Sequence, residues 1–169
     1  MKKTGAFMRI KSTLLFIALA VMLVCGVTVS AGYAKSINEL EQQANKGDVA
    51  AQYNLAEMYF DGDGVEQDDI KYAYWLGKAA EQGHAEAQVR LGYMYYSGDS
   101  IAQDYAKAVY WFEKAVEQGN GAAQLNLGTM YYNGQGVTQD KQKGCALLRA
   151  AVDQDSQDAK DLYYRDCQQ

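Results

Sequence analysis

Residues 83–118 read GHAEAQVRLGYMYYSGDSIAQDYAKAVYWFEKAVEQ, and this stretch decides the fold because nearly the same pattern lies on either side of it. A shift of 36 residues in each direction gives residues 47–82 and 119–154, with glycine, Ala-Gln, leucine, Met-Tyr, glycine, Gln-Asp and lysine at matching places. A repeat of this length is typical of stacked helical arrays, in which each repeat buries its apolar face against the next. We therefore predict an all-α solenoid.

Each repeat divides into two helices. In the first repeat, apolar residues spaced i, i+4, i+7 and i+8 predict a helix over about residues 49–60 (helix A), and a second stripe that includes Trp75 predicts one over about 69–81 (helix B). A glycine recurs between the two helices, where the chain needs a positive φ: Gly62, Gly98 and Gly134. Each repeat is thus an antiparallel helix hairpin.

Capping residues stand at matching places before the helices. Asp68, Asp104 and Asp140 precede the three B helices, where a carboxylate can accept hydrogen bonds from free amides. The residues before successive A helices are Asp48, His84, Asn120 and Ser156. Three of these four are preferred N-caps, and His84 is the exception.

Mid-helix glycines indicate close packing. Gly92 and Gly128 lie within A helices, where glycine costs roughly 0.5–1 kcal/mol relative to alanine, so a neighbouring helix or a large ring should lie against the backbone. Trp75 and Trp111 are the candidate rings. Leu147 stands where the third repeat should have tryptophan, so we expect that repeat to pack less tightly.

The array has polar ends. Ser36 to Glu39 form a capping box that predicts an N-terminal capping helix up to residue 46, and Ser156 to Gln168 match a fourth A helix with many charges. The predicted organisation is residues 1–31 signal, 32–46 N-terminal cap, 47–82, 83–118 and 119–154 repeats, and 155–169 C-terminal cap.

The first 31 residues resemble an export signal. A basic head precedes an apolar run over 14–24, and Val29-Ser30-Ala31 offers a cleavage site before Gly32, with a second one after Ala34. We therefore expect a periplasmic or secreted protein. Two alternatives stay open: no charge occurs between Lys11 and Lys35, a stretch long enough to anchor an uncleaved chain in a membrane, and Cys25 could accept lipid.

The charge excludes nucleic acid as a partner. The chain has 16 basic and 21 acidic residues, and the signal contains four of the basic ones and no acidic ones. The mature chain therefore has twelve basic residues against twenty-one acidic ones, and so lacks the basic surface that nucleic-acid binding needs. The absence of proline suits uninterrupted helices.

The repeat resembles a known family. Leu91-Gly92-Tyr93-Met94-Tyr95 and Lys114-Ala115-Val116-Glu117-Gln118-Gly119 resemble the Sel1-like repeat, a relative of the tetratricopeptide repeat, and the resemblance extends over residues 47–154. It implies right-handed stacking of helix pairs and protein–protein contact. Exported bacterial members look like envelope adaptors, regulators of signalling receptors or factors in host contact.

Repetition separates packing positions from a candidate partner surface. On helix A the positions that vary between repeats share one face, and in related arrays helix A lines the concave side. The alternative is that these residues are peripheral core and solvated surface. The candidate partner-binding residues are Tyr53, Asn54, Glu57, Arg90, Tyr93, Tyr96, Asn126, Thr129 and Tyr132.

Catalytic and metal-binding patterns are sparse, so we expect no enzyme, no cofactor and no metal. His84 is the only histidine and belongs to a turn, which excludes zinc motifs with paired histidines. Cysteine-rich relatives have been linked to penicillin binding or β-lactamase activity, which makes a cell-wall or β-lactam-directed enzyme the rival hypothesis. The Ser-x-x-Lys motif of such enzymes is absent, and the one Lys-Thr-Gly lies in the signal.

Two cysteines remain after export. Cys145 and Cys167 are equally distant from residue 156, inside the predicted turn, so antiparallel helices bring them together. We expect a disulfide in an oxidising compartment, against free or intermolecular thiols. The hypothesis is a monomeric exported adaptor that holds a protein or peptide partner on its concave helix-A face, with a membrane- or lipid-anchored adaptor as the alternative.

Overall fold

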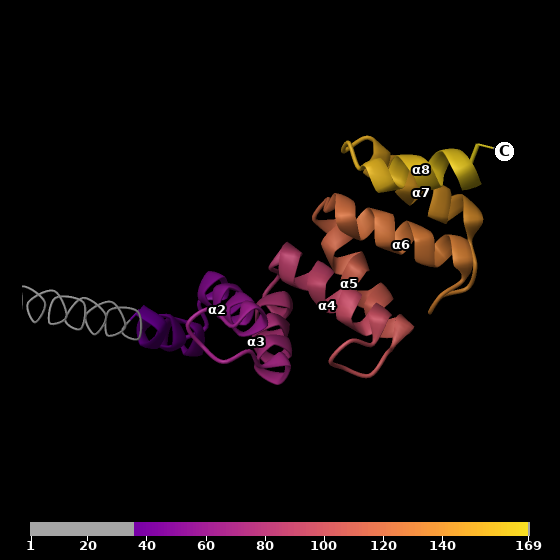
Figure 1. The fold of residues 1–169 in the computed structure, drawn as a ribbon. Coiled ribbons are helices and arrows are strands. Elements are labelled where there is room, and N and C mark those ends of the chain that lie inside the picture. Colours follow the sequence, from indigo (N-terminus) through magenta and orange to yellow (C-terminus); the bar gives the residue numbers. More distant parts are fainter. Residues whose placement is uncertain (1–35, 169) are drawn as a thin grey trace, which may run out of the picture. The chain divides into compact units, whose positions relative to one another are not determined.

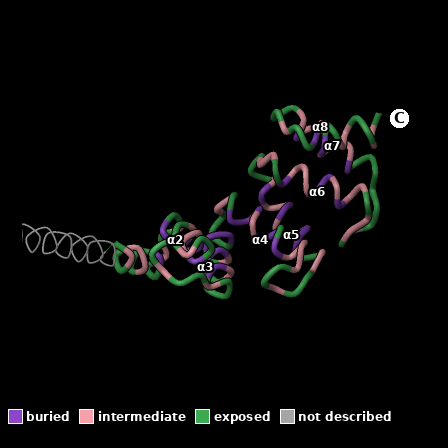
Figure 2. Tube along the Cα trace, viewed as in Figure 1, coloured by how far each residue is buried: buried purple, intermediate pink, exposed green. Residues whose placement is uncertain are grey.

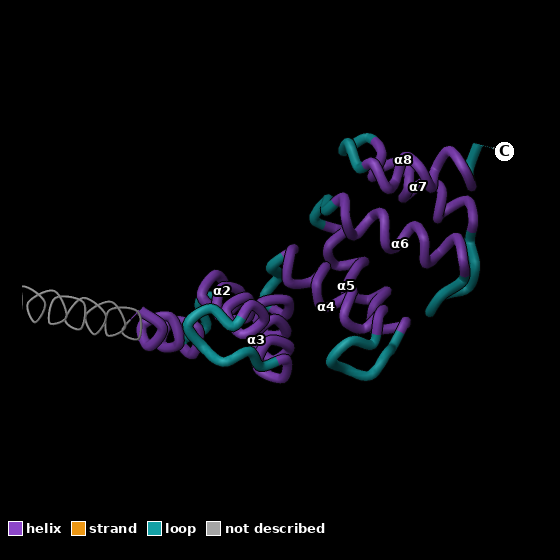
Figure 3. The backbone as a smooth tube through the Cα atoms, in the orientation of Figure 1, coloured by secondary structure: helices purple, strands orange, loops and turns teal. Residues whose placement is uncertain are grey.

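The computed structural model describes residues 36–168, all of them in helices, turns and loops (Figure 3). The chain divides into two compact units, residues 1–42 and 43–169. Residues 36–45 are helical. The helices that follow are α2 Val49–Asp61, α3 Asp69–Glu81, α4 Ala85–Ser97, α5 Tyr105–Glu117, α6 Gly121–Asn133, α7 Lys141–Val152 and α8 Gln157–Asp166 (Figure 1).

The expected signal and the first residues of the N-terminal cap lie outside the described residues. Within residues 36–168, no helix has the length and apolar character needed to span a bilayer.

The helices form adjacent pairs, as predicted. α2 packs on α3, α4 on α5 and α6 on α7, and consecutive pairs meet through α3 with α4 and α5 with α6. The glycine that ends each A helix has a positive φ, 71° at Gly62, 79° at Gly98 and 73° at Gly134. Its N–H bonds the carbonyl of the methionine four residues earlier, so only a residue that tolerates the left-handed region closes this helix end.

The caps expected before α2 to α8 are formed. Asp68, Asp104 and Asp140 accept hydrogen bonds from the first-turn amides of α3, α5 and α7. The A helices are capped in the same way, and His84 is no exception, because its Nδ1 accepts from the Ala87 N–H at 3.3 Å. The imidazole of His84 therefore replaces the usual short polar cap.

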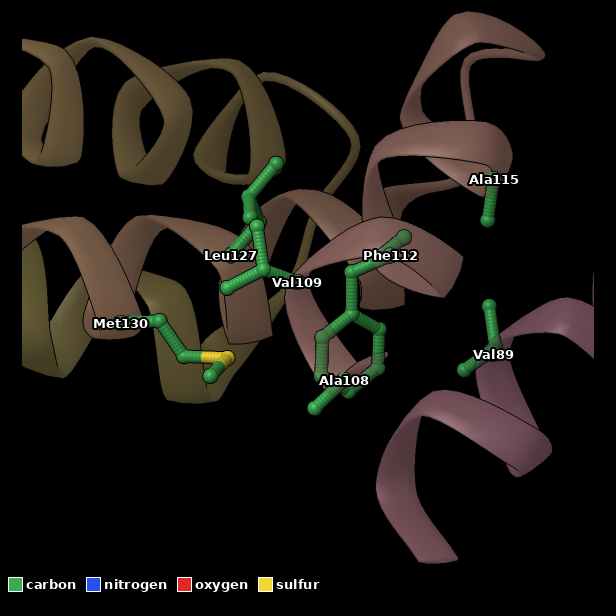
Figure 4. Packing of buried hydrophobic residues seen from close by; sticks show 8 residues of the cluster. Val89, Ala108, Val109, Phe112, Ala115, Leu127 and Met130 are labelled. Atoms are coloured by element: carbon green, nitrogen blue, oxygen red, sulfur yellow. The ribbon is translucent and has the colours of Figure 1, made fainter. Parts of the chain in front are cut away.

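The core corrects the role given to tryptophan. Figure 4 shows the cluster formed by α4, α5 and α6, in which Phe112, Leu127 and Met130 are almost fully buried. Trp75 and Trp111 are only half-buried, and each makes an edge contact with the exposed tyrosine before it, Tyr74 or Tyr110. The prediction that a tryptophan ring lies against the mid-helix glycines was wrong, because the helix turns the residue after each tryptophan inward, Leu76 or Phe112.

The mid-helix glycines do allow close contact, through other partners. A Cβ placed on Gly92 would lie 2.8 Å from the ring of Phe112. A Cβ on Gly128 would lie 3.0 Å from the backbone oxygen of Gly144, and one on Gly144 would lie 2.8 Å from the oxygen of Gly128. The third pair is therefore not loosely packed, contrary to expectation, because two glycines let the backbones of α6 and α7 meet.

Glutamine side chains connect each repeat to the next. Gln88 is buried, donates to the Ala80 carbonyl at 3.1 Å and accepts from the Gln118 amide at 2.8 Å. Gln52 makes the equivalent bonds to Ala44 and Gln82. Because each buried amide has partners on two sides, a slip in helix register would leave it unsatisfied.

The C-terminal helix is attached mainly at its ends and through one buried residue. Ala159 is the buried residue of α8, and Ser156 caps the helix. A disulfide joins Cys145 of α7 to Cys167 just after α8, with the two Cα atoms 5.7 Å apart. The bond predicted from the spacing is thus present. In Figure 2 the loops between helices are mostly exposed, and buried segments lie within the helices.

Candidate functional site

A pocket of about 410 Å³ opens between the first and second repeats. Its walls come from the end of α2, the start of α3, one face of α4, the turn after α4 and one residue of α6. The lining residues are Phe60, Asp69, Tyr72, Val89, Arg90, Tyr93, Met94, Ser97, Asp99, Ser100 and Asn126. Its size falls in the range of roughly 300–1,000 Å³ that is usual for ligand sites.

The floor of the pocket is apolar and its edge is aromatic. Tyr72, Val89 and Met94 are buried, so they form the floor. Phe60 and Tyr93 remain 44% and 53% exposed, although both are large. Exposed aromatic rings beside a buried apolar floor leave an unfilled contact surface, the arrangement in which an inserted side chain is well desolvated.

Arg90 is held in place by acidic and aromatic neighbours. Its guanidinium lies 3.0 Å from Glu57 of α2 and 3.6 Å from Glu86 of its own helix. It also faces the ring of Tyr53 at 6.0 Å, and that ring stacks on His84 at 4.3 Å. The one basic residue of the pocket is therefore neutralised by two carboxylates.

The pKa values agree with this arrangement. Burial raises the pKa of the Glu57 carboxyl, and the charge of Arg90 opposes that rise. Burial by itself lowers the pKa of Arg90, but a hydrogen bond with Tyr72 and the charge of Glu57 outweigh it, so the pKa of Arg90 lies above its ordinary value. Burial also raises the pKa of the Tyr72 phenol. Arg90 is thus charged and Tyr72 neutral at physiological pH.

Two further carboxylates lie at the pocket edge. Asp69 at the start of α3 accepts a hydrogen bond from the Ser100 hydroxyl at 2.7 Å. Ser100 has a φ of 64° where the other repeats have glycine, so this bond connects a strained turn to the preceding repeat. Within the described residues, no lysine or arginine forms an ion pair with Asp69 or Asp99.

The predicted partner-binding residues fall into three groups. Arg90, Tyr93 and Asn126 line the pocket. Tyr53 and Glu57 support Arg90 from α2, and Tyr96 lies beside Tyr93 with ring centroids 6.5 Å apart. The pocket thus uses a part of the predicted face.

The remaining predicted residues lie apart from the pocket. Asn54 is exposed on α2, and Thr129 bonds the carbonyl one turn earlier in α6. The Tyr132 hydroxyl donates to the Asp166 carbonyl at 3.2 Å and so connects α6 with α8. No structural contact places these three with the pocket residues.

Sequence reasoning missed part of the lining. Phe60 lies at a position of helix A that varies between repeats, so the criterion that selected the other residues could have selected it too. Asp69, Asp99 and Ser100 belong to a B helix and a turn, and only folding brings them to helix A. The signal for Ser100 was its departure from the recurring glycine.

The chemistry of the pocket is set by its mixed lining. The lining has apolar and aromatic surface, carboxylates, a hydroxyl and one neutralised guanidinium. Between residues 36 and 168, no three His, Cys, Asp or Glu side chains converge to hold a metal ion.

The chain matches a family model three times in succession. The model described as Sel1 repeat matches residues 49–84, 85–120 and 121–156. No curated protein matches the chain.

Several solved structures are similar to the chain. A Sel1 repeat protein from Oxalobacter formigenes is 35% identical, with a TM-score of 0.72, 78% of this chain and 98% of that chain covered. A protective antigen of uropathogenic Escherichia coli strains that displays an SLR fold is 37% identical, with a TM-score of 0.71, and the match covers 76% of this chain and 28% of the antigen. Cysteine rich protein B of Helicobacter pylori is 22% identical over 79% of this chain and 96% of that chain, with a TM-score of 0.59, which shows the fold alone.

Proposed function

The chain belongs to the Sel1 repeat family, and from that premise we propose that it is an exported, non-enzymatic scaffold that binds a segment of another protein. The binding surface is the face of the A helices α2, α4 and α6, which we take to be the concave side. We propose repeats over residues 47–82, 83–118 and 119–154, with an N-terminal cap segment over 32–46 and a C-terminal cap segment over 155–169.

The observation that carries this proposal is the pocket between the first two repeats. Its apolar floor is buried, and the exposed rings of Phe60 and Tyr93 stand at its edge. Three of the residues selected from sequence variation between repeats, Arg90, Tyr93 and Asn126, line it. A surface that varies where the packing positions recur is available for recognition.

Two observations support an extracytoplasmic location. The first 31 residues have the basic, apolar and small-residue order of an export signal. The disulfide between Cys145 and Cys167 is of the kind that persists in oxidising compartments. A membrane- or lipid-anchored form would present the same surface, and the mass of the mature N-terminus distinguishes it from the cleaved form.

Partner capture with two matched variants tests the proposal. Tyr93 on α4 and Tyr110 on α5 are exposed to the same extent, 53% and 52%, but lie on the A helix and the B helix of one repeat. Tyr93→Ala should weaken the retention of a partner from periplasmic extract, and Arg90→Glu should do the same without loss of helicity. Tyr110→Ala should leave retention unchanged.

Two results would contradict the proposal. One is capture of the same partner at equal strength by all three variants. The other is loss of capture by Tyr110→Ala alone, which would move the binding surface to the B helices. Circular dichroism of each variant ensures that lost binding does not reflect lost structure.

A further inference from the structure

The pocket between the first two repeats has a charge pattern that selects its guest. We propose that it binds a short peptide segment in which one large apolar side chain is flanked by lysine or arginine. This inference rests on the proposed function and adds the chemistry of the partner.

The apolar part of the guest follows from the floor. Tyr72, Val89 and Met94 present carbon and sulfur surface at the bottom, and Phe60 and Tyr93 extend it at the edge. Met94 adapts to irregular shapes because its thioether is flexible and polarisable. A leucine, methionine or phenylalanine side chain would bury its surface there, whereas a polar side chain would lose its water without compensation.

The basic part follows from the sign of the uncompensated charge. Arg90 forms ion pairs with Glu57 and Glu86, so the single cation of the lining exerts no net attraction on acidic guests. Asp69 accepts a hydrogen bond from the Ser100 hydroxyl, Asp99 is exposed, and neither carboxylate forms an ion pair among the described residues. The edge is therefore negative, and lysine or arginine beside the inserted side chain would complement it.

The surroundings strengthen the same preference. The mature chain has twelve basic residues against twenty-one acidic ones, so its long-range field attracts cationic segments. Ile70, next to Asp69 at the start of α3, is 82% exposed and offers further apolar contact beside the acidic edge.

The experiment is an NMR titration of the 15N-labelled full chain, after export processing, with three twelve-residue probes. All probes are glycine- and serine-rich with acetylated and amidated ends. The first carries a central leucine flanked by two lysines on each side, the second the same leucine flanked by glutamates, and the third a central serine flanked by lysines.

The first probe should shift the amides of Tyr93, Ser97 and Asp99 and bind about tenfold more tightly than the second, because each exposed charge pair contributes modestly and several act together. Its affinity should fall as salt rises from 0.05 to about 0.5 M, since screening shortens the range of these charges. The third probe should bind at least several-fold more weakly than the first.

Matched variants separate pocket charge from net charge. Asp99→Asn should lower the affinity for the lysine–leucine probe several-fold and reduce its salt dependence. Asp158→Asn, which removes one exposed carboxylate of α8, changes the net charge equally and should have almost no effect. Asp69→Asn is a second test at the edge, and an unchanged amide spectrum elsewhere shows that it folds.

Several outcomes would overturn the inference. Equal or tighter binding of the glutamate probe would refute the charge preference while leaving the helix-A surface as the partner site. Shifts confined to other residues, or no shift with any probe at millimolar concentration, would refute the pocket as a peptide site. Equal weakening by Asp158→Asn would assign the effect to net charge alone.

Discussion

The second helix pair, α4 with α5, and the third, α6 with α7, share their recurring residues but differ in what fills the contact between the two helices. Between α4 and α5 the ring of Phe112 lies against Gly92, so a side chain fills the space between the helices. Between α6 and α7 the backbones themselves meet at Gly128 and Gly144. A disulfide ties α8 to α7. The second pair depends on a ring and the third on close backbone approach, and a covalent bond ties the third pair to α8.

The difference shows which positions carry which information. Glycine turns, caps and the glutamine bonds recur in both pairs and set the register of the stack. Two positions of helix B differ between the pairs and set the distance between the helices. They are Ala108 and Phe112 in the second pair, and Gly144 and Leu148 in the third. Four experiments can break or sharpen this comparison.

Truncating the ring should have the largest effect. Phe112→Ala should lower the free energy of unfolding by about 3–5 kcal/mol, because Phe112 is fully buried and the pair has little else to close the cavity. Trp111→Ala should cost less than Phe112→Ala, because the indole is only half-buried. Urea unfolding followed by circular dichroism measures both, and a larger loss for Trp111→Ala would show that the ring is not the main closure.

Removing the disulfide, which ties α8 to α7, should have the next largest effect on stability. The bond closes a loop with a sequence separation of 22, for which chain entropy predicts about 3 kcal/mol. Cys145→Ala with Cys167→Ala should lower the urea midpoint, and reduction of the unaltered protein should lower it similarly. Reducing agent should not affect the double variant. An unchanged midpoint would mean that α8 is held by its noncovalent contacts alone.

Adding a methyl group should distinguish ring from backbone contact. Gly92→Ala should cost about 1–3 kcal/mol through overpacking. Phe112→Leu in the same chain should recover most of this cost, because the first repeat has alanine and leucine at the two matching positions. Gly144→Ala should cost a similar amount without rescue by Leu148→Ala, because its Cβ would meet the backbone of Gly128 and Tyr132. Rescue at Gly144 would contradict the backbone contact.

The cap of α5 should have the smallest effect. Hydrogen bonds from the backbone, above all from the Lys107 N–H, lower the pKa of Asp104, so the charged cap stabilises the fold above the ordinary pKa and loses this contribution as pH falls through the lowered value. Asp104→Asn should therefore be slightly less stable than the unaltered chain at pH 7, and the difference should disappear as pH falls through the lowered pKa of Asp104. A difference that persists at low pH would show that the carboxylate charge is not responsible.

The sequence predicts the fold well because its signals are local and repeated. Helix bounds, glycine turns, caps and the Cys145–Cys167 bond all follow from spacing within one or two helices. The prediction that Trp111 rather than Phe112 turns inward was wrong. Adjacent positions differ by 100° around a helix, and the apolar stripe alone does not decide which of the two faces the core. The closeness of α6 and α7 also needed the pairing of Gly128 with Gly144.

The site is less predictable from sequence. Tyr93 and Arg90 were selected because they vary between repeats, but Asp69 and Ser100 reach the pocket through a bond between two repeats. Tyr132 varies in the same way, yet its hydroxyl donates to the Asp166 carbonyl of α8. Position in the array therefore decides which varying residues remain free for a partner.

Photo-crosslinking in cells tests the central claim most directly. A benzoylphenylalanine is placed at position 93 or at position 110, two sites of equal exposure on the two helices of one repeat. The account predicts a discrete crosslinked partner from position 93 and none, or far less, from position 110. A partner crosslinked only from position 110, or equally from both, would contradict the assignment of the helix-A face as the binding surface.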